Sequence, residues 1–341
     1  MSKIEYLFIS RCLSEFAGAI LPVVFPLFIL KTTHSLSLSG LFFTITMLPS
    51  VLLTPAMVVW IEKYEKKKVT FFSVLTLAIL CSIGSMLLKF GRYDFIYLVC
   101  FAILVAIFSM MLDLSSKIVE ESFVQKFRIG LHFIRTEKAI LKYFLLIMAL
   151  NFFVASSEEV TNPGIAIQKY HLPTSIFGLV SIAFSIGVIL SGIFIAKNSK
   201  IEFRKHISKL FVLNSLVMVL IGFSSVFLIS FNAFVFFGLM LFFEVLLGFI
   251  TILVNVPITS FFQSQVPLNI QSRFFALLSF SANLIVPLGI LYTGFLASAI
   301  GADVTYIINN ILVIVIVCFA FWKEIGRGFR AFLLKKWKMS K

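Results

Sequence analysis

Long apolar stretches alternate with short polar gaps along the whole of this 341-residue chain. A helix needs about 20 predominantly apolar residues to cross the hydrocarbon core of a bilayer. Because lipid offers the backbone no hydrogen-bond partner, apolar stretches of this length are expected to be helical. The pattern therefore predicts an all-α polytopic membrane protein with about ten transmembrane helices, at residues 7–30, 38–60, 69–89, 93–114, 141–165, 174–196, 208–229, 232–256, 274–298 and 302–322.

The longest polar break inside the chain begins at Ser115 and separates four predicted helices from the next six. Apolar residues within this break recur on one side of a helix, at Phe123, Phe127, Leu131 and Ile134. That spacing predicts an amphipathic helix on the inner membrane surface. The predicted order is an N-terminal bundle, an amphipathic cytoplasmic linker, a C-terminal bundle and a basic cytoplasmic tail, at residues 1–114, 115–140, 141–322 and 323–341.

Lysines and arginines crowd into every second gap between the apolar stretches. With the N-terminus in the cytoplasm, these basic gaps all lie inside, as the positive-inside rule requires. The gaps on the other side hold few cations: Lys31, Lys89, Arg92 and Lys169. We therefore predict a multi-pass protein of the cytoplasmic membrane with both termini inside the cell.

The composition excludes an ordinary soluble domain, because 60% of the residues are hydrophobic and 13% are charged. The net charge of +14 sits on loops and tails that flank the apolar stretches. There it orients the helices and meets anionic lipid headgroups, so we expect the lipid bilayer as a partner and no nucleic acid.

No enzyme or metal-site signature accompanies these helices. The four cysteines fall inside predicted spans without metal-type spacing, and the four histidines lie in loops without a common helix face. The sequence has no glycine-rich nucleotide loop, no HExxH and no Ser/His/Asp set. We expect no enzymatic activity, no cofactor and no metal.

Glu244 is the most isolated acidic residue, near the middle of the apolar stretch 234–253. A charge at the centre of a transmembrane helix costs about 2.5–3.5 kcal/mol, so its presence asks for a reason. One interpretation is a proton-coupling carboxylate. The other is a neutral glutamate hydrogen-bonded to a neighbouring helix.

Three other acidic residues interrupt apolar stretches. Glu15 lies four residues after Arg11, which favours an ion pair on one helix face, or a position beside a cavity. Glu158 and Glu159 precede Asn162 and Pro163, and because neighbouring helical residues point about 100° apart, at most one of the two can face a cavity. An outer gate and a solvated helix end are both consistent with this pair.

The stretch 255–289 carries a family resemblance. Its landmarks are an Asn-x-Pro, a Gln before Val-Pro, an arginine in a short loop, and a Pro-x-Gly: Asn255, Pro257, Gln265, Val266, Pro267, Arg273, Pro287 and Gly289. This order resembles the signature of helix 10, loop and helix 11 in the macrolide- and drug-efflux-like branch of the major facilitator superfamily. The resemblance implies a major-facilitator-like helical bundle.

Three further regions resemble the same family. Residues 177–195 have small residues at the family's positions, Gly178, Gly187 and Gly192, and residues 130–153 lead into an Asn-Phe-Phe at Asn151. The loop 62–68 is similar to the family's charged loop between helices 2 and 3.

The resemblance implies roles for these positions. Asn151 and Asn255 join the four glutamates as coupling or substrate candidates. The implied gating loop consists of Glu62, Lys63, Glu65, Lys66 and Lys67 together with Arg273. The implied helix-packing positions are Gly178, Gly187, Gly192, Pro257, Pro287 and Gly289.

The chain also departs from the family pattern. Members usually have twelve transmembrane helices, and the shortage here falls in the first half, where the family's fourth and fifth helices are expected to be absent. Val58 and Ser272 stand where the family has glycines, and Glu62 stands where aspartate is usual.

The expected function is secondary active transport: export of small amphipathic or hydrophobic molecules by alternating access, with protons as the coupling ion. The alternative is a shortened, non-transporting family member that acts as a membrane partner or is a decaying gene product. If helices are missing, a homo-oligomer is a way to supply them.

Overall fold

The structure is a computed structural model that describes residues 28–61, 64–89, 95–116, 123–198, 206–228 and 232–322. Within these ranges the chain is helical and has no strand. Eight of the described helices are long and apolar enough to cross a membrane. The protein is therefore an all-α polytopic membrane protein. The predicted span 7–30 lies almost entirely outside the described residues.

The described helices follow the predicted spans closely. Before the linker they are α2 (Leu36–Ile61), α3 (Lys66–Lys89) and α4 (Phe95–Ser116), and the linker itself contains α5 (Phe123–Thr136). After it come α6 (Lys138–Leu150), η1 (Asn151–Ala155), α7 (Ser156–Pro163), η2 (Gly164–Lys169), α8 (Thr174–Lys197), α9 (Ile207–Phe227), α10 (Ala233–Gln265), α11 (Leu268–Ile300) and α12 (Ala302–Ala320).

One difference from the predicted spans has a physical reason. The span expected to end at 256 continues as α10 to Gln265, because Pro257 is accommodated inside the helix. Transmembrane helices tolerate such prolines when neighbouring groups satisfy the freed carbonyl. The predicted span 69–89 lies within α3, which runs from Lys66 to Lys89.

The helices form two compact units, and the first comprises residues 1–132 with 273–298. In this unit α4 packs against both α2 and α3. Helix α11 approaches α2 closely, since a Cβ on Gly40 would lie 3.4 Å from the Cα of Gly294. Ser37 Oγ donates to Ser298 Oγ at 2.6 Å in the same crossing.

The two compact units do not coincide with the predicted N-terminal and C-terminal bundles. The sequence division at 115–140 assigns the helix 274–298 to the C-terminal bundle, whereas its contacts group it with the first unit. Thr44 Oγ1 on α2 donates to the carbonyl of Pro287 on α11 at 2.9 Å. The sequence division itself stays a prediction.

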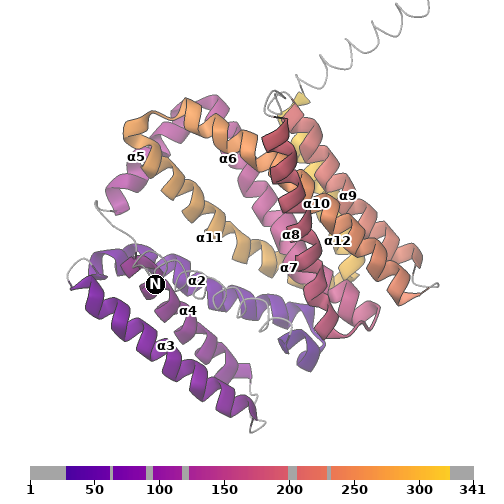
Figure 1. Cartoon of the computed structure of the whole chain (residues 1–341), viewed down its shortest axis with the longest axis horizontal. Helices are drawn as coiled ribbons and strands as arrows, with labels where there is room; N and C mark the ends of the chain where they lie inside the picture. The colour runs from indigo at the N-terminus through magenta and orange to yellow at the C-terminus, as the bar shows by residue number, and fades with distance from the viewer. Residues whose placement is uncertain are drawn as a thin grey trace, which may run out of the picture. The chain divides into compact units, whose positions relative to one another are not determined.

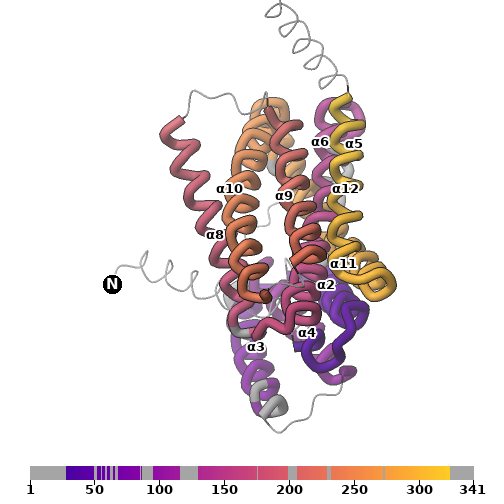
Figure 2. The backbone as a smooth tube through the Cα atoms, turned by 90° about the vertical axis from the view of Figure 1, so that its right-hand side faces the viewer, coloured from indigo at the N-terminus to yellow at the C-terminus, as the bar shows by residue number. Residues whose placement is uncertain are grey.

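The second unit, residues 133–272 with 299–341, contains the candidate site. Helices α6, η1, α7 and η2 form one continuous span, Lys138–Lys169. Helix α12 packs along this span and against α9; α9 packs against α10, and α10 against α8 (Figure 2). The α8–α10 crossing is the tightest, because a Cβ on Gly187 or Gly248 would overlap a backbone carbonyl of the opposite helix.

Candidate functional site

A pair of glutamates meets in the interior of the second unit, where side chains of α7 form hydrogen bonds with side chains of α10 and α12, the helices labelled in Figure 1. Glu158 comes from α7 and Glu244 from α10. The side-chain amide of Asn162 joins them: its Nδ2 donates to Glu158 Oε2 at 2.6 Å and to Glu244 Oε1 at 3.1 Å. Because Asn162 lies one helical turn after Glu158, a single turn of α7 presents both groups to α10.

Helix α12 completes the site with a tyrosine. The hydroxyl of Tyr306 donates to Glu158 Oε1 at 3.1 Å, so each oxygen of this carboxylate accepts a hydrogen bond. Glu244 and Asn162 are each 1% exposed and Tyr306 is fully buried. Glu158 is partly exposed and is therefore the member of the pair nearest to the surface of the unit.

The carboxyl groups of Glu158 and Glu244 lie close together without a cationic partner among the described residues. Burying a carboxylate away from water is costly unless it is paired or hydrogen-bonded. Among the described residues, no lysine or arginine forms an ion pair with Glu158 or Glu244. Two carboxylates that share one amide donor repel each other strongly when both are ionised, so the arrangement is suited to holding a proton or another cation.

The backbone around Glu158 is irregular. Helix α7 lies between two π-helical segments, η1 and η2, and Pro163 stands inside it. Proline has no N–H, so the carbonyl of Glu159 lacks its usual helical donor. Single-turn π segments are frequent at functional sites, because they re-aim side chains and offer alternative backbone hydrogen bonds.

Polar contacts continue from the pair along the interface of α7 and α12. Asn309 Nδ2 donates to Ser157 Oγ at 2.9 Å, and both residues are fully buried. Asn310 Nδ2 donates to the carbonyl of Tyr306 at 2.8 Å. The Oδ1 atoms of Asn162 and Asn310 are buried and accept no hydrogen bond from the described residues.

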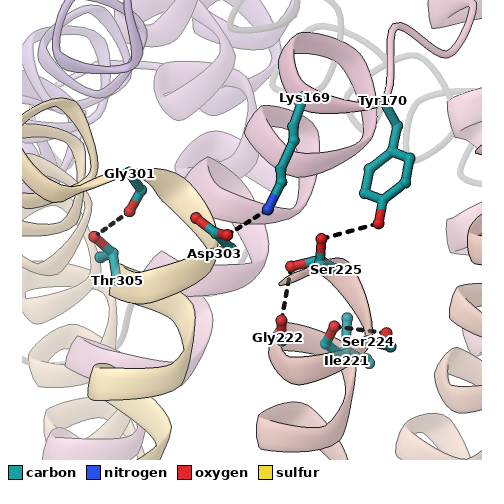
Figure 3. Close-up of polar contacts among 9 residues, drawn as sticks. All are labelled: Lys169, Tyr170, Ile221, Gly222, Ser224, Ser225, Gly301, Asp303 and Thr305. Atoms are coloured by element: carbon teal, nitrogen blue, oxygen red, sulfur yellow. Dashed lines mark hydrogen bonds and ion pairs between the residues drawn. The ribbon is translucent and has the colours of Figure 1, made fainter. Parts of the chain in front are cut away.

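A second polar group lies where α12 begins. Lys169, the last residue of η2, forms an ion pair with Asp303, and their side chains are 23% and 16% exposed (Figure 3). The Tyr170 hydroxyl donates to the carbonyl of Ser225 on α9 at 2.9 Å, and its ring stacks on Phe236 of α10 at 4.0 Å between centroids. Burial and the nearby charge of Asp303 raise the pKa of the Tyr170 phenol.

The structure brings two of the predicted acidic residues together and leaves a third outside. Glu158 and Glu244 share Asn162, whereas the adjacent Glu159 is exposed. Glu15 lies outside the described residues.

The predicted asparagines and loop residues stand apart from this pair. Asn151 Nδ2 donates to the carbonyl of Ile147 in its own helix, and Asn255 is exposed on α10. In the predicted gating loop, Glu65 pairs with Lys68 at 2.9 Å on an exposed surface. Glu62 and Lys63, together with the side chains of Lys66 and Lys67, lie outside the described residues. Arg273 is partly buried on α11.

The residues predicted to pack helices together differ in how closely other helices approach them. A Cβ on Gly187 would meet α10, but Cβ atoms on Gly178 and Gly192 would meet no atom within 4 Å. Pro257, Pro287 and Gly289 are buried.

Sequence reasoning missed the contribution of α12. Tyr306 and Asn309 lie three residues apart in a helix that is otherwise strongly apolar, and Asp303 precedes Tyr306 by the same interval. This i, i+3 recurrence of polar residues inside an apolar span was a readable signal that one face of α12 meets a polar partner.

No protein-family model matches the chain, and no curated protein matches it. The resemblance to the major facilitator superfamily therefore remains a prediction, and the fold class is established only as an all-α polytopic membrane protein.

Proposed function

We propose that the protein is a secondary active transporter of small amphipathic molecules in which the Glu158–Glu244 pair binds the coupling proton. The observation that carries the proposal is the pair itself: two acidic side chains inside a transmembrane bundle, joined by one amide and lacking a cationic partner in the described part of the chain. Ionisable residues within membrane spans are rare and commonly mark proton or substrate pathways.

Sharing a proton links the chemistry of the pair to the geometry of the helices. With one proton bound, the two carboxyl groups can lie close together around Asn162. When that proton leaves, repulsion between the two charges favours a conformation in which α7 and α10 are farther apart. The π segments and Pro163 supply the backbone freedom for such a movement of α7.

The proposal includes the architecture that the sequence predicts. Ten transmembrane helices in a major-facilitator-like arrangement, with both termini in the cytoplasm, would place the pair inside a bundle that alternates between two openings. The substrate is a small amphipathic or hydrophobic molecule and the protein is an exporter of the cytoplasmic membrane.

A flux assay in proteoliposomes tests the proposal. The full chain is reconstituted, a pH gradient is imposed, and the accumulation of amphipathic fluorescent dyes is measured with and without the gradient. The matched variants are Glu244→Gln and Glu158→Gln, which keep the shape of the side chain and remove its charge, with the exposed Glu137→Gln as control.

We expect gradient-driven flux in the unchanged protein and in Glu137→Gln, and none in Glu244→Gln or Glu158→Gln. Glu244→Gln is expected to fold normally, because glutamine resembles the protonated acid. Folded protein that moves no dye under any gradient would contradict the proposal and favour a non-transporting membrane partner. Undiminished coupling in both glutamine variants would exclude the pair as the proton site.

A further inference from the structure

The buried face of α12 changes character along its length. Asp303, Tyr306 and Asn310 follow each other at intervals of three and four residues, which puts them on one face of the helix. The same face continues with Val313 and Val317, which are 1% and 0% exposed. This face is therefore polar over its first two turns and apolar over the rest.

Polar residues in the first half of α12 contact one neighbouring span, Lys138–Lys169. Asp303 pairs with Lys169, Tyr306 donates to Glu158 at 3.1 Å, and Asn309 donates to Ser157 at 2.9 Å. Helix α12 packs along α6, η1, α7 and η2 of this span. Polar contacts between α12 and this span thus occur both at the Lys169–Asp303 ion pair and at the carboxylate pair.

Three buried polar atoms in this region have no hydrogen-bond partner among the described residues: Asn162 Oδ1, Gln168 Nε2 and Asn310 Oδ1. Buried polar atoms are nearly always satisfied by protein groups or by water. Unsatisfied atoms next to a polar interface are therefore places where water molecules can bind and bridge its members.

Aromatic side chains surround the other end of the same helix, and the ammonium group of Lys142 lies 3.6 Å from the centroid of the Phe321 ring there. Beyond Val317, Phe321 is 1% exposed, and its ring lies 5.9 Å from that of Tyr143 between centroids. Tyr143 in turn lies 5.0 Å from the ring of Phe261. In the described residues, the buried face of α12 carries no polar side chain between Asn310 and this aromatic group.

We propose that the polar face of α12 is the route by which protons reach the Glu158–Glu244 pair, that it opens only at the Asp303 end, and that the Lys169–Asp303 ion pair closes it. This inference rests on the proposed function, since it names the access route of the same site. By the predicted orientation, the Asp303 end faces the outside of the cell.

The proton would pass from solvent to Glu158 along the titratable groups of this route. A proton from solvent passes the partly exposed Lys169 and Asp303 and reaches Glu158, whose carboxylate takes it up and becomes a carboxylic acid. Tyr306 faces Glu158 from α12, and Glu244 faces it from α10 through Asn162. Glu159 is exposed and Tyr170 faces α9 and α10, so neither lies on this route.

Cysteine labelling tests the route independently of transport. The four native cysteines are replaced by serine in the full chain, and single cysteines are introduced as Ala302→Cys, Asn310→Cys, Val313→Cys and Val317→Cys. Each variant is reconstituted, and the membrane-impermeant reagent 2-(trimethylammonium)ethyl methanethiosulfonate is added to one side of the vesicles at a time.

We expect labelling of Ala302→Cys and Asn310→Cys from the side of the Asp303 end. Val313→Cys and Val317→Cys should react at least about tenfold more slowly, because a thiol in a packed apolar face reacts only after local opening. The pair Asn310→Cys and Val313→Cys is the decisive comparison, since the two positions lie less than one helical turn apart. Equal rates at these two positions, or labelling of Asn310→Cys from the opposite side, would overturn the inference.

The closure is tested by adding Lys169→Gln to Asn310→Cys. Loss of the ion pair should accelerate labelling at residue 310, while the charge-swapped combination Lys169→Asp with Asp303→Lys should restore the slower rate. An unchanged rate in Lys169→Gln would refute the ion pair as a closure.

The outcomes separate the two proposals. One-sided labelling in a protein without gradient-driven flux would support the route and contradict the transport function. Gradient-driven flux with no difference between residues 310 and 313 would support transport and contradict the route.

Discussion

Asn162 is expected to be the residue on which the folding of the carboxylate site depends most. Its amide donates to Glu158 and to Glu244, which belong to different helices, and it is 1% exposed. Replacement by leucine keeps a similar volume and removes both hydrogen bonds. The two carboxyl groups then lose their shared donor, and Glu244 loses the interhelical bond that the structure gives it.

The expected loss of stability follows from the two hydrogen bonds of the Asn162 amide. A hydrogen bond to a charged group contributes about 1.5–3 kcal/mol and a bond to a neutral group about 0.5–1.5 kcal/mol. With one proton in the pair, one bond is of each kind, so Asn162→Leu should lower the free energy of unfolding by about 2–4.5 kcal/mol. Neutral interhelical bonds in membranes average only about 0.6 kcal/mol each, which sets the lower limit near 1 kcal/mol.

Unfolding by sodium dodecyl sulfate in mixed micelles, followed by circular dichroism, measures this difference. The matched control is Asn255→Leu, because Asn255 is an exposed asparagine on α10 and its replacement should change stability little. A loss below about 1 kcal/mol in Asn162→Leu, or one equal to that of the control, would refute the conclusion that the amide holds the pair together.

Three further predictions concern packing, backbone and titration. Gly248→Ala should destabilise the protein by about 1–3 kcal/mol in the same unfolding assay, because its Cβ would overlap α8, whereas Gly192→Ala meets open space and should be neutral or better. Pro163→Ala supplies the missing backbone donor and should raise stability by up to about 3 kcal/mol while slowing dye flux; faster flux would contradict a hinge at this position. Asp303→Asn should move the ultraviolet titration of Tyr170 to lower pH, because burial and the Asp303 charge raise the pKa of this phenol. Because folding raises this pKa, the Tyr170 phenol contributes stability below its ordinary pKa of 10.0, and this contribution is lost as the pH rises through the folded pKa. A Tyr170 titration that Asp303→Asn does not shift would exclude Asp303 as a cause of the raised pKa.

The membrane-spanning helices were predictable because each satisfies its own backbone hydrogen bonds in lipid, so local composition suffices. The predicted span 302–322, for example, is α12 almost residue for residue. Composition was a poorer guide to the end of α10, since the span predicted to end at 256 continues through Pro257 to Gln265. The π segments around α7 were not predictable from composition either, because their hydrogen bonds depend on how the span packs against α12.

The candidate site was predictable only in its parts. Glu158 and Glu244 stood out as acids in apolar stretches, but nothing local indicated that they meet. The bond from Asn162 to Glu244 joins positions 82 residues apart, and that from Tyr306 to Glu158 joins positions 148 apart. Lipid is as apolar as a protein interior, so hydrophobic periodicity does not tell which face of a membrane helix turns inward.

By itself, then, the sequence determined that this chain is a helical membrane protein and which residues would be costly to bury, because both depend on the transfer of short segments from water to lipid. Only the tertiary structure decided that Glu158 and Glu244 share Asn162, that α12 supplies Tyr306, and that α11 joins the first unit. Those outcomes depend on how distant helices pack side by side, which is a property of the whole bundle and of no single segment.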